Sequence, residues 1–184
     1  MTLQRQQGFS VVELAVVLAV TAIMAMIAVM SFQTTTQSFK LNGAALQIAA
    51  DVRYARSLSV DNSGIYGVHW GGDPNEISPP GPSFYRLEKN TGTGCSWPAV
   101  ADTADSNANV ITDWSDLSTE FPGITIVSIV DSISTVHGGA AFNSWGASNN
   151  PCAGVAYPVT ITVTNASGVT KTIEVRSAGS VKKL

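Results

Sequence analysis

The sequence predicts an α+β fold, in which a long amino-terminal helix packs on a carboxyl-terminal antiparallel β domain. Three observations predict it. Residues 14–39 contain no charged side chain, residues 41–58 place apolar side chains every three or four positions, and alternating apolar residues between turn signals follow from residue 65. The chain of 184 residues is long enough for one such helix and one small domain.

The apolar run over residues 9–32 is long enough to cross a membrane. Its roughly 24 residues would form a helix of about 36 Å, which exceeds a hydrocarbon core of about 30 Å. Glu13 is the only charged residue between Arg5 and Lys40. A carboxylate inside a membrane segment costs about 2.5–3.5 kcal/mol, so Glu13 calls for a functional explanation and a partner.

Residues 8–14, Gly-Phe-Ser-Val-Val-Glu-Leu, resemble the class III signal of type IV pilins and type II secretion pseudopilins. The shared features are a short polar leader ending in Gly, a Phe, a Glu five residues after the Gly, and an apolar run. The resemblance implies that a prepilin peptidase cuts between Gly8 and Phe9 and methylates the new amino group of Phe9. It also implies that Glu13 pairs with the amino group of Phe9 in a neighbouring subunit, which fixes the register of a filament.

Two other interpretations of the apolar run stay open. An ordinary secretory signal peptide would need a more basic start than Arg5 and a small-x-small cleavage site, for which residues 22–28 offer weak candidates. A plain membrane anchor would tolerate Glu13 near its end. Neither interpretation gives Glu13 a role.

Residues 33–62 predict an amphipathic continuation of the same helix, without a proline kink because the first proline is Pro74. Asn62-Ser63-Gly64 predicts its end. Thr34-Thr35-Thr36 and Gly43 lower the helix propensity locally. The apolar stripe consists of Leu41, Ala45, Ile48, Val52, Ala55 and Leu58, and the residues that mostly avoid it are Lys40, Gln47, Asp51, Arg53 and Arg56.

The segment Arg53-Tyr54-Ala55-Arg56 resembles the Leu-Arg-Tyr-Ala-Arg-Ser signature of the GspH/FimT group of minor pseudopilins and minor pilins. In that group the signature ends the long helix, and the position here agrees. The resemblance is clear over residues 8–70 and faint beyond them. An amphipathic helix with two exposed arginines is the alternative interpretation of the segment.

The remainder predicts a β domain with one long loop. Residues 90–118 are polar and lack apolar periodicity, which predicts the loop. Strands are expected at residues 65–70, 83–88, 121–130, 133–137, 140–142, 159–164 and 169–175, with a short edge strand at 179–184. Turn residues 165–168 join the best hairpin, whose buried positions are Val159, Ile161 and Val163 or their alternates.

The two cysteines, Cys95 and Cys152, form a disulfide if the domain lies outside the cytoplasm. Closing a loop of about 58 residues would stabilise the fold by about 4 kcal/mol in the chain-entropy model. Two free buried thiols are the alternative.

No enzyme site, cofactor or metal is predicted. His69 and His137, the only histidines, lack metal-ligand spacing with the cysteines, and no nucleophile elbow or phosphate loop occurs. Carboxylate and amide oxygens in the long loop could hold Ca²⁺, although a solvated loop is the preferred interpretation. They belong to Asp102, Asp105, Asn107, Asn109, Asp113 and Asp116.

The tail Gly179-Ser180-Val181-Lys182 partly matches the Gly-Arg-x-Arg of DNA-binding FimT-type pilins. Ser180 replaces one arginine of that pattern. Lys182 and Lys183 offer a weak DNA contact, although a solvated basic tail is preferred, and the net charge of −3 gives no broad basic face.

These features predict a minor pilin-like subunit of a type II secretion system. Its parts are a leader (1–8), a transmembrane and assembly helix (9–32), an amphipathic continuation (33–62) and a periplasmic β domain (63–184). The expected location is the bacterial inner membrane, and the expected partners are prepilin peptidase, an inner-membrane assembly platform and other pilins or pseudopilins. The alternatives are a type IV pilus minor pilin, acting in assembly priming, adhesion or DNA uptake, and a membrane-anchored ligand-binding β domain.

Overall fold

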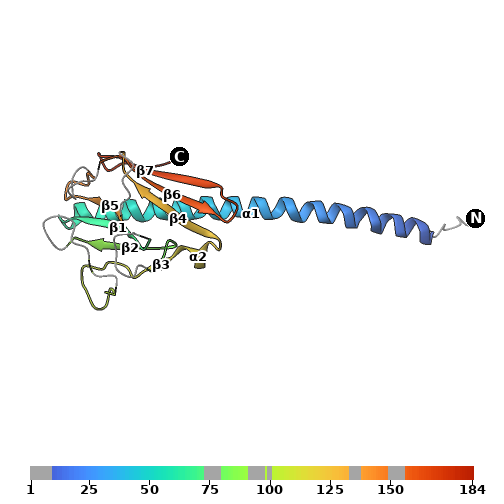
Figure 1. Ribbon diagram of the computed structural model, residues 1–184, viewed down its shortest axis with the longest axis horizontal. Coiled ribbons are helices and arrows are strands. Elements are labelled where there is room, and N and C mark those ends of the chain that lie inside the picture. The colour runs from blue at the N-terminus through green and yellow to red at the C-terminus, as the bar shows by residue number, and fades with distance from the viewer. Residues whose placement is uncertain (1–9, 73–79, 91–97, 99–100, 133–137, 149–155) are drawn as a thin grey trace, which may run out of the picture. The chain divides into compact units, whose positions relative to one another are not determined.

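The computed structural model describes residues 10–72, 80–90, 98, 101–132, 138–148 and 156–184. The chain divides into an amino-terminal unit, Met1–Ser38, and a compact unit, Phe39–Leu184. One helix, α1 (Val11–Asp61), contributes residues to both units (Figure 1). Each unit is described by itself below.

Helix α1 has the length that the sequence predicts, and the threonine run and Gly43 do not interrupt it. Its end is a Schellman-type turn within Asn62-Ser63-Gly64. The Gly64 N–H donates to the Ser59 carbonyl at 3.1 Å, and Ser63 takes the left-handed conformation with φ of 48°. The predicted stop is therefore confirmed, with Ser63 in the place that glycine usually fills.

In the part of the compact unit that the structure describes, the strands form two four-stranded antiparallel sheets. The first has the order β3-β2-β1-β5, formed by Ser115–Asp116, Phe84–Lys89, Tyr66–Trp70 and Gly139–Phe142. The second has the order β4-β6-β7-β8, formed by Ile124–Val130, Val159–Asn165, Thr170–Val175 and Val181–Lys183. The short helix α2 (Leu117–Glu120) directly precedes β4.

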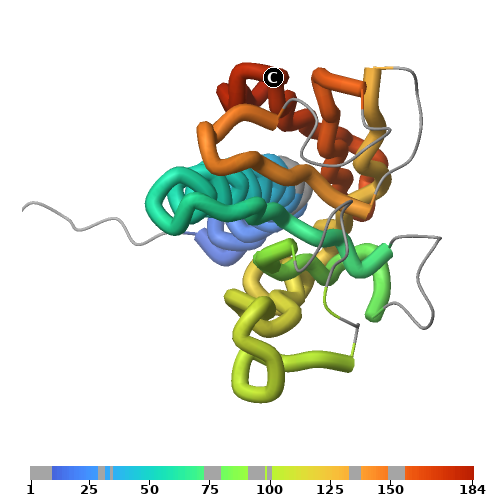
Figure 2. Tube along the Cα trace, turned by 90° about the vertical axis from the view of Figure 1, so that its left-hand side faces the viewer, coloured from blue at the N-terminus to red at the C-terminus, as the bar shows by residue number. Residues whose placement is uncertain are grey.

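The apolar face of α1 and both sheets share one core. From the helix this core takes Leu41, Ala44, Ala45, Ile48, Ala49, Val52 and Ala55, each at most 1% exposed. The spacing of three and four keeps these residues on one face. Figure 2 looks along the part of α1 that lies in the compact unit and has β2 on one side of it and β6 and β7 on the other. The predicted stripe is thus the centre of the domain.

Each predicted strand that the structure describes is present, with bounds within three residues of the prediction; the strand predicted from residue 121 begins at Ile124, and the edge strand predicted from residue 179 begins at Val181. Val159, Ile161 and Val163 are buried, as the alternation of that hairpin predicts. The strand predicted at 133–137 lies outside the described residues.

The loop prediction for 90–118 is wrong at its end, where β3 and the first residues of α2 form. Asp116 accepts from the Ser118 N–H at 2.9 Å and caps α2, and β3 pairs with Phe84 and Tyr85 of β2. Pairing partners about thirty residues apart leave no local pattern in the sequence.

Candidate functional site

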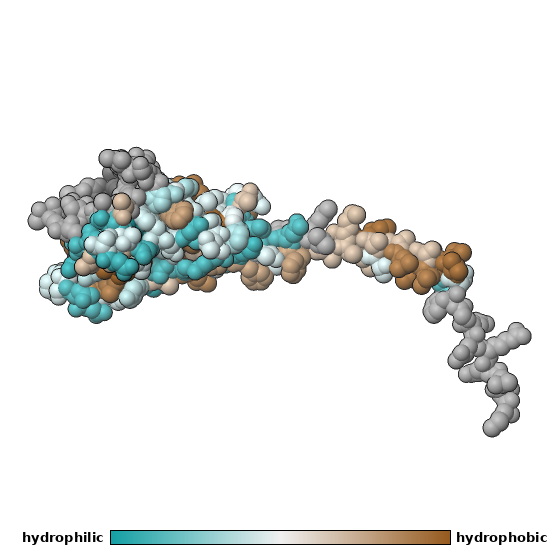
Figure 3. Space-filling view, turned by 90° about the horizontal axis from the view of Figure 1, so that it is seen from below, coloured by the Kyte–Doolittle hydropathy of each residue, from teal (hydrophilic) through white to brown (hydrophobic). Residues whose placement is uncertain are grey.

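The amino-terminal part of α1 exposes apolar side chains on every face. Residues 11–28 are all exposed within their unit, with Val11 at 83% and Met26 at 68%. The 18-residue stretch Val11–Ala28 has a mean hydropathy of 2.6 and is long enough to cross a membrane. Figure 3 shows the apolar colour along this part of α1. A helix that is apolar all round is stable only inside a membrane or among other apolar helices.

Glu13 lies in the first turn of this helix. Ser10 caps the turn, since its Oγ accepts from the Val12 N–H at 3.3 Å and its carbonyl accepts from the Leu14 N–H at 3.1 Å. Ser10 and Glu13 therefore have the spacing of a capping box, and a carboxylate here also interacts favourably with the helix dipole. A carboxylate at this position can therefore also stabilise the start of the helix, besides the intersubunit pair that the sequence predicts.

The signature segment at the other end of α1 connects the helix to one distant turn and to strand β8. Arg56 Nε donates to the Gly146 carbonyl at 2.8 Å, and Arg53 Nη2 donates to the Val181 carbonyl at 3.1 Å. Ala55 is buried in the core, whereas Tyr54 is about half exposed. The segment therefore combines one core residue with two arginines that hold backbone carbonyls of later elements.

Two glycines allow this close packing. A Cβ at Gly179 would lie 1.9 Å from the Gly146 carbonyl oxygen and 2.7 Å from Arg56 Nε. Both glycines have a positive φ, 70° at Gly146 and 76° at Gly179. The Gly179 that the sequence assigns to a DNA-binding pattern thus has a structural reason to be glycine.

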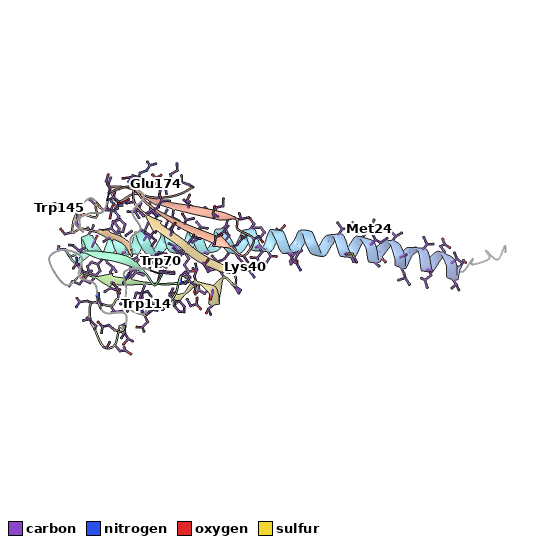
Figure 4. All side chains as sticks on the ribbon, viewed as in Figure 1. Met24, Lys40, Trp70, Trp114, Trp145 and Glu174 are labelled. Atoms are coloured by element: carbon purple, nitrogen blue, oxygen red, sulfur yellow. The ribbon has the colours of Figure 1, made fainter. Side chains whose placement is uncertain are left out.

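An open groove of about 350 Å³ lies along the exposed face of the same helix end, lined by Arg53, Arg56, Ser57, Val60 and Asp61. Next to it, the turn that carries Gly146 presents Trp145, which is 86% exposed. Figure 4 shows Trp145 at the edge of the domain by the carboxyl-terminal end of α1. The sequence interpretation missed Trp145, although a tryptophan in an Asn-Ser-Trp-Gly turn has no core position to fill.

A second polar contact anchors the middle of α1. The Tyr85 hydroxyl donates to Asp51 Oδ2 at 2.6 Å and accepts from Gln47 Nε2 at 3.3 Å. Burial raises the pKa of the Asp51 carboxyl, and the hydrogen bond from Tyr85 partly offsets that rise. Burial is also the main cause that raises the pKa of Tyr85, followed by the bond to Asp51.

The first sheet buries an ion-paired cluster that sequence reasoning did not find. Glu88 accepts from Arg86 Nε and contacts His69 Nδ1 at 3.0 Å, and all three side chains are at most 3% exposed. Arg86 also donates to the carbonyls of Asp102 and Pro98 at 2.8 and 3.2 Å and lies 4.3 Å from the Trp114 ring centroid. The cluster ties the long loop to β2, and alternation within β2 cannot predict it because that pattern places Arg86 and Glu88 outward.

The predicted calcium ligands of the long loop form local hydrogen bonds. Asp102 accepts from Asn107 at 2.8 Å, Asp113 accepts from the Ala104 N–H at 2.8 Å, and Asp116 caps α2. In the part of the chain that the structure describes, no three acidic, histidine or cysteine side chains gather as a metal site would require.

The tail lysines lie on β8 and do not lie side by side on one face. Lys182 is opposite Glu174 of β7, whereas Lys183 Nζ donates to Asn42 Oδ1 of α1 at 3.4 Å. Arg176, at the end of β7, forms an ion pair with Glu174. DNA binding by Lys182 and Lys183 stays a prediction.

Several predicted sites fall outside the described residues. They are the cleavage and methylation site at Gly8 and Phe9 and the disulfide between Cys95 and Cys152. These remain expectations from the sequence.

Comparison with known proteins gives a motif and a fold. Residues 3–29 match the family model of the prokaryotic N-terminal methylation motif, and no curated protein matches the chain. Solved structures of the type IV minor pilin FimU of Pseudomonas aeruginosa are similar at 15% identity, with a TM-score of 0.49, covering 81% of this chain and 91% of that one.

The minor pseudopilin EpsH of the type II secretion system of Vibrio cholerae is similar at 9% identity, with a TM-score of 0.51. The match covers 79% of this chain and 93% of that one. At this identity the likeness concerns the fold: a long apolar helix followed by antiparallel sheets. The chain thus combines a prokaryotic N-terminal methylation motif at one end with a fold that is similar to that of a minor pseudopilin.

Proposed function

We propose that this chain is a minor subunit of a pilus-like filament, assembled through its amino-terminal helix. The observation that carries the proposal is the exposed apolar stretch Val11–Ala28, which lies inside the matched methylation motif. A membrane can cover such a helix before assembly, and neighbouring helices can cover it afterwards. One segment then serves as both anchor and assembly surface.

In this proposal prepilin peptidase cuts between Gly8 and Phe9 and methylates Phe9. The chain then waits in the inner membrane with residues 63–184 in the periplasm. On assembly, Glu13 pairs with the amino group of Phe9 in a neighbouring subunit. The pair sets the register, because a shifted helix would bury both charges without partners.

Of the two systems with such subunits, we place the type II secretion pseudopilus first. The segment Arg53-Tyr54-Ala55-Arg56, whose resemblance is to the GspH/FimT group, supports a minor subunit in either system. A type IV pilus minor pilin is the second candidate, because the matched motif is common to prokaryotic pilins.

Mass spectrometry of the amino-terminal peptide, on protein extracted from membranes, tests the proposal. We expect a chain that begins at methylated Phe9. A matched Gly8→Ala variant should keep the leader and stay in the membrane. A wild-type chain that begins at Met1 or near residue 29 would overturn the proposal and favour an anchored binding domain or a secreted protein.

Deletion of the gene in its host separates the two systems. Loss of a pseudopilus should leave exported enzymes in the periplasm while surface pili remain. Loss of surface pili with normal secretion would instead assign the chain to a type IV pilus. Complementation with the Gly8→Ala variant should fail in either case.

A further inference from the structure

The carboxyl-terminal end of α1 leaves one helix face uncovered by the rest of the domain. The residues of this face are spaced as i, i+3, i+4, i+7 and i+8, and they line the groove of about 350 Å³: Arg53, Arg56, Ser57, Val60 and Asp61. We call this surface the arginine groove. Val60 remains 48% exposed there.

Both arginines in the groove are fixed in place but keep N–H groups for a partner. Each donates one hydrogen bond to a backbone carbonyl, Arg53 to that of Val181 and Arg56 to that of Gly146. Among the residues that the structure describes, the ion pairs include Arg86 with Glu88 and Arg176 with Glu174, and neither groove arginine takes part in one. Asp61 lines the same groove without bridging to either of them.

The rim of the groove presents a fixed aromatic side chain. Asn143 Oδ1 accepts from the N–H groups of Trp145 and Ala147, both at 3.0 Å, and the Gly146 N–H donates to the Asn143 carbonyl at 2.8 Å. Arg56 holds the same turn from the helix side. Trp145 is therefore exposed on a rigid turn, and tryptophan with arginine is the composition typical of strong interface contacts.

We infer that the arginine groove binds an acidic segment of a neighbouring subunit in the filament, with a carboxylate on Arg53 and Arg56 and an apolar side chain against Trp145 and Val60. The guanidinium fork suits a carboxylate because it can donate two parallel hydrogen bonds. This inference rests on the proposed function, since it names the chemistry of a partner in the same assembly.

A protein carboxylate fits the groove better than a nucleic acid does. Nucleic-acid affinity grows with the number of phosphates neutralised, and here two arginines share the groove with Asp61. The nearby tail cations do not extend the surface, because Arg176 is paired with Glu174 and Lys182 lies opposite the same residue. A short segment with one or two carboxylates and an apolar neighbour matches both the charge and the size of the groove.

The test is photo-crosslinking in the host, with the full-length chain carrying p-benzoylphenylalanine in place of Ser57. Ser57 lines the groove, is exposed, and its hydroxyl bonds only to the Tyr54 carbonyl of its own helix. We expect a crosslink to a different subunit, within a few residues of an Asp or Glu. Arg53→Gln, Arg56→Gln and Trp145→Ala should each lower the crosslink yield about tenfold, whereas the exposed control Arg176→Gln should not.

Replacing the crosslinked Asp or Glu of the other subunit with its amide gives a second test that leaves this chain unaltered. It should lower the yield by the same factor, even if Arg56→Gln prevents folding. The inference would be overturned by the absence of a crosslink, or by a crosslink to DNA, lipid or a second copy of this chain. It would also be overturned if these substitutions left the crosslink yield unchanged. Mass spectrometry of the same sample identifies the first residue of the mature chain. A chain that is not cut before Phe9 counts against the proposed function. A chain that is cut and assembled but gives no crosslink counts against the arginine groove alone.

Discussion

At the scale of single residues, two arginine–glutamate pairs show how burial decides the value of a charge. Arg86 with Glu88, and Arg176 with Glu174, are both pairs two residues apart on a strand or at its end. The side chains of the first pair are fully buried, whereas the Arg176 side chain is 54% exposed. Water screens the second pair and cannot reach the first, so their contributions to stability should differ severalfold.

Glu88→Gln should lower the free energy of unfolding by about 3–5 kcal/mol, because it leaves the buried Arg86 charge without its carboxylate. Glu174→Gln, the matched exposed control, should cost no more than about 1 kcal/mol. Urea unfolding of the full chain in detergent measures both. Equal losses would mean that Arg86 is held by its other contacts and that Glu88 adds little.

Asp51 should make stability depend on pH. Burial raises its pKa above the unfolded value, so the folded state binds the proton more tightly than the unfolded chain does. The contribution of Asp51 is therefore favourable at low pH and is lost as the pH rises through the raised pKa. Asp51→Asn should remove this loss, so that its stability relative to wild type increases from about pH 3 to pH 7.

Unfolding curves at several pH values measure this difference. Asp61→Asn, an exposed carboxylate on the same helix, is the control. Parallel pH profiles for wild type and Asp51→Asn would contradict the assignment.

At the scale of elements, the elements that follow local periodicity agree with the prediction. Each of these elements is determined by a short stretch of consecutive residues. They are the apolar stripe from Leu41 to Ala55, the alternation from Val159 to Val163 and the helix end at residues 62–64. The order of the two sheets, the pairing of β3 with β2 and the burial of Arg86 and Glu88 depend on contacts between distant segments. The alternation in β2 places Arg86 on the face away from the core and so predicts that it is exposed, whereas the long loop covers that face and buries it.

The same limit applies to the candidate site. The sequence located Glu13, Arg53 and Arg56 by resemblance, but it could not show which carbonyls the arginines hold. The sequence did not indicate Trp145, because its exposure depends on a turn that Asn143 stabilises and on the contact of that turn with Arg56 at the end of α1.

The junction between α1, β8 and the Gly146 turn depends on glycine, and two positions test this. Gly179 and Gly168 have almost the same φ, 76° and 78°, but a Cβ would meet the Gly146 carbonyl at the first and nothing within 4 Å at the second. Gly168→Ala should cost about 1–2 kcal/mol for backbone conformation alone. Gly179→Ala should cost about 1–3 kcal/mol more, because the backbone carbonyl must move. Chemical unfolding measures the loss of stability in both variants. Equal losses would show that the backbone around Gly146 can move to accommodate the added Cβ with little loss of free energy.

At the scale of the whole molecule, assembly should depend on the charge of Glu13. Glu13→Gln keeps an oxygen acceptor at the third helical position, so the capping box survives and the chain should be processed and inserted normally. Incorporation into filaments should fall at least about tenfold, because removing one partner of a buried pair costs roughly 3–5 kcal/mol. The fraction of chain in sheared filaments relative to membranes measures this.

Ser10→Ala is the matched control, since it removes the capping hydroxyl and keeps the charge. It should cost about 1 kcal/mol of local helix stability and leave assembly nearly intact. The reverse ranking of the two variants would assign Glu13 a capping role only.

Because α1 is exposed over Val11–Ala28 and buried on one face further along, the two parts of the helix should tolerate different substitutions. Among the described side chains of α1, the first buried one is Leu41, so a polar substitution at Val16 or Ile23 removes no contact from the domain core. A deep mutational scan should therefore find two unrelated profiles along the helix. Before residue 39, the effect of a substitution should depend on the hydrophobicity of the new side chain, whichever face of the helix it occupies, and the melting temperature should not change. Beyond residue 39, sensitivity to substitution should recur every three to four residues, and the sensitive positions should be those at which substitution lowers the amount of folded protein.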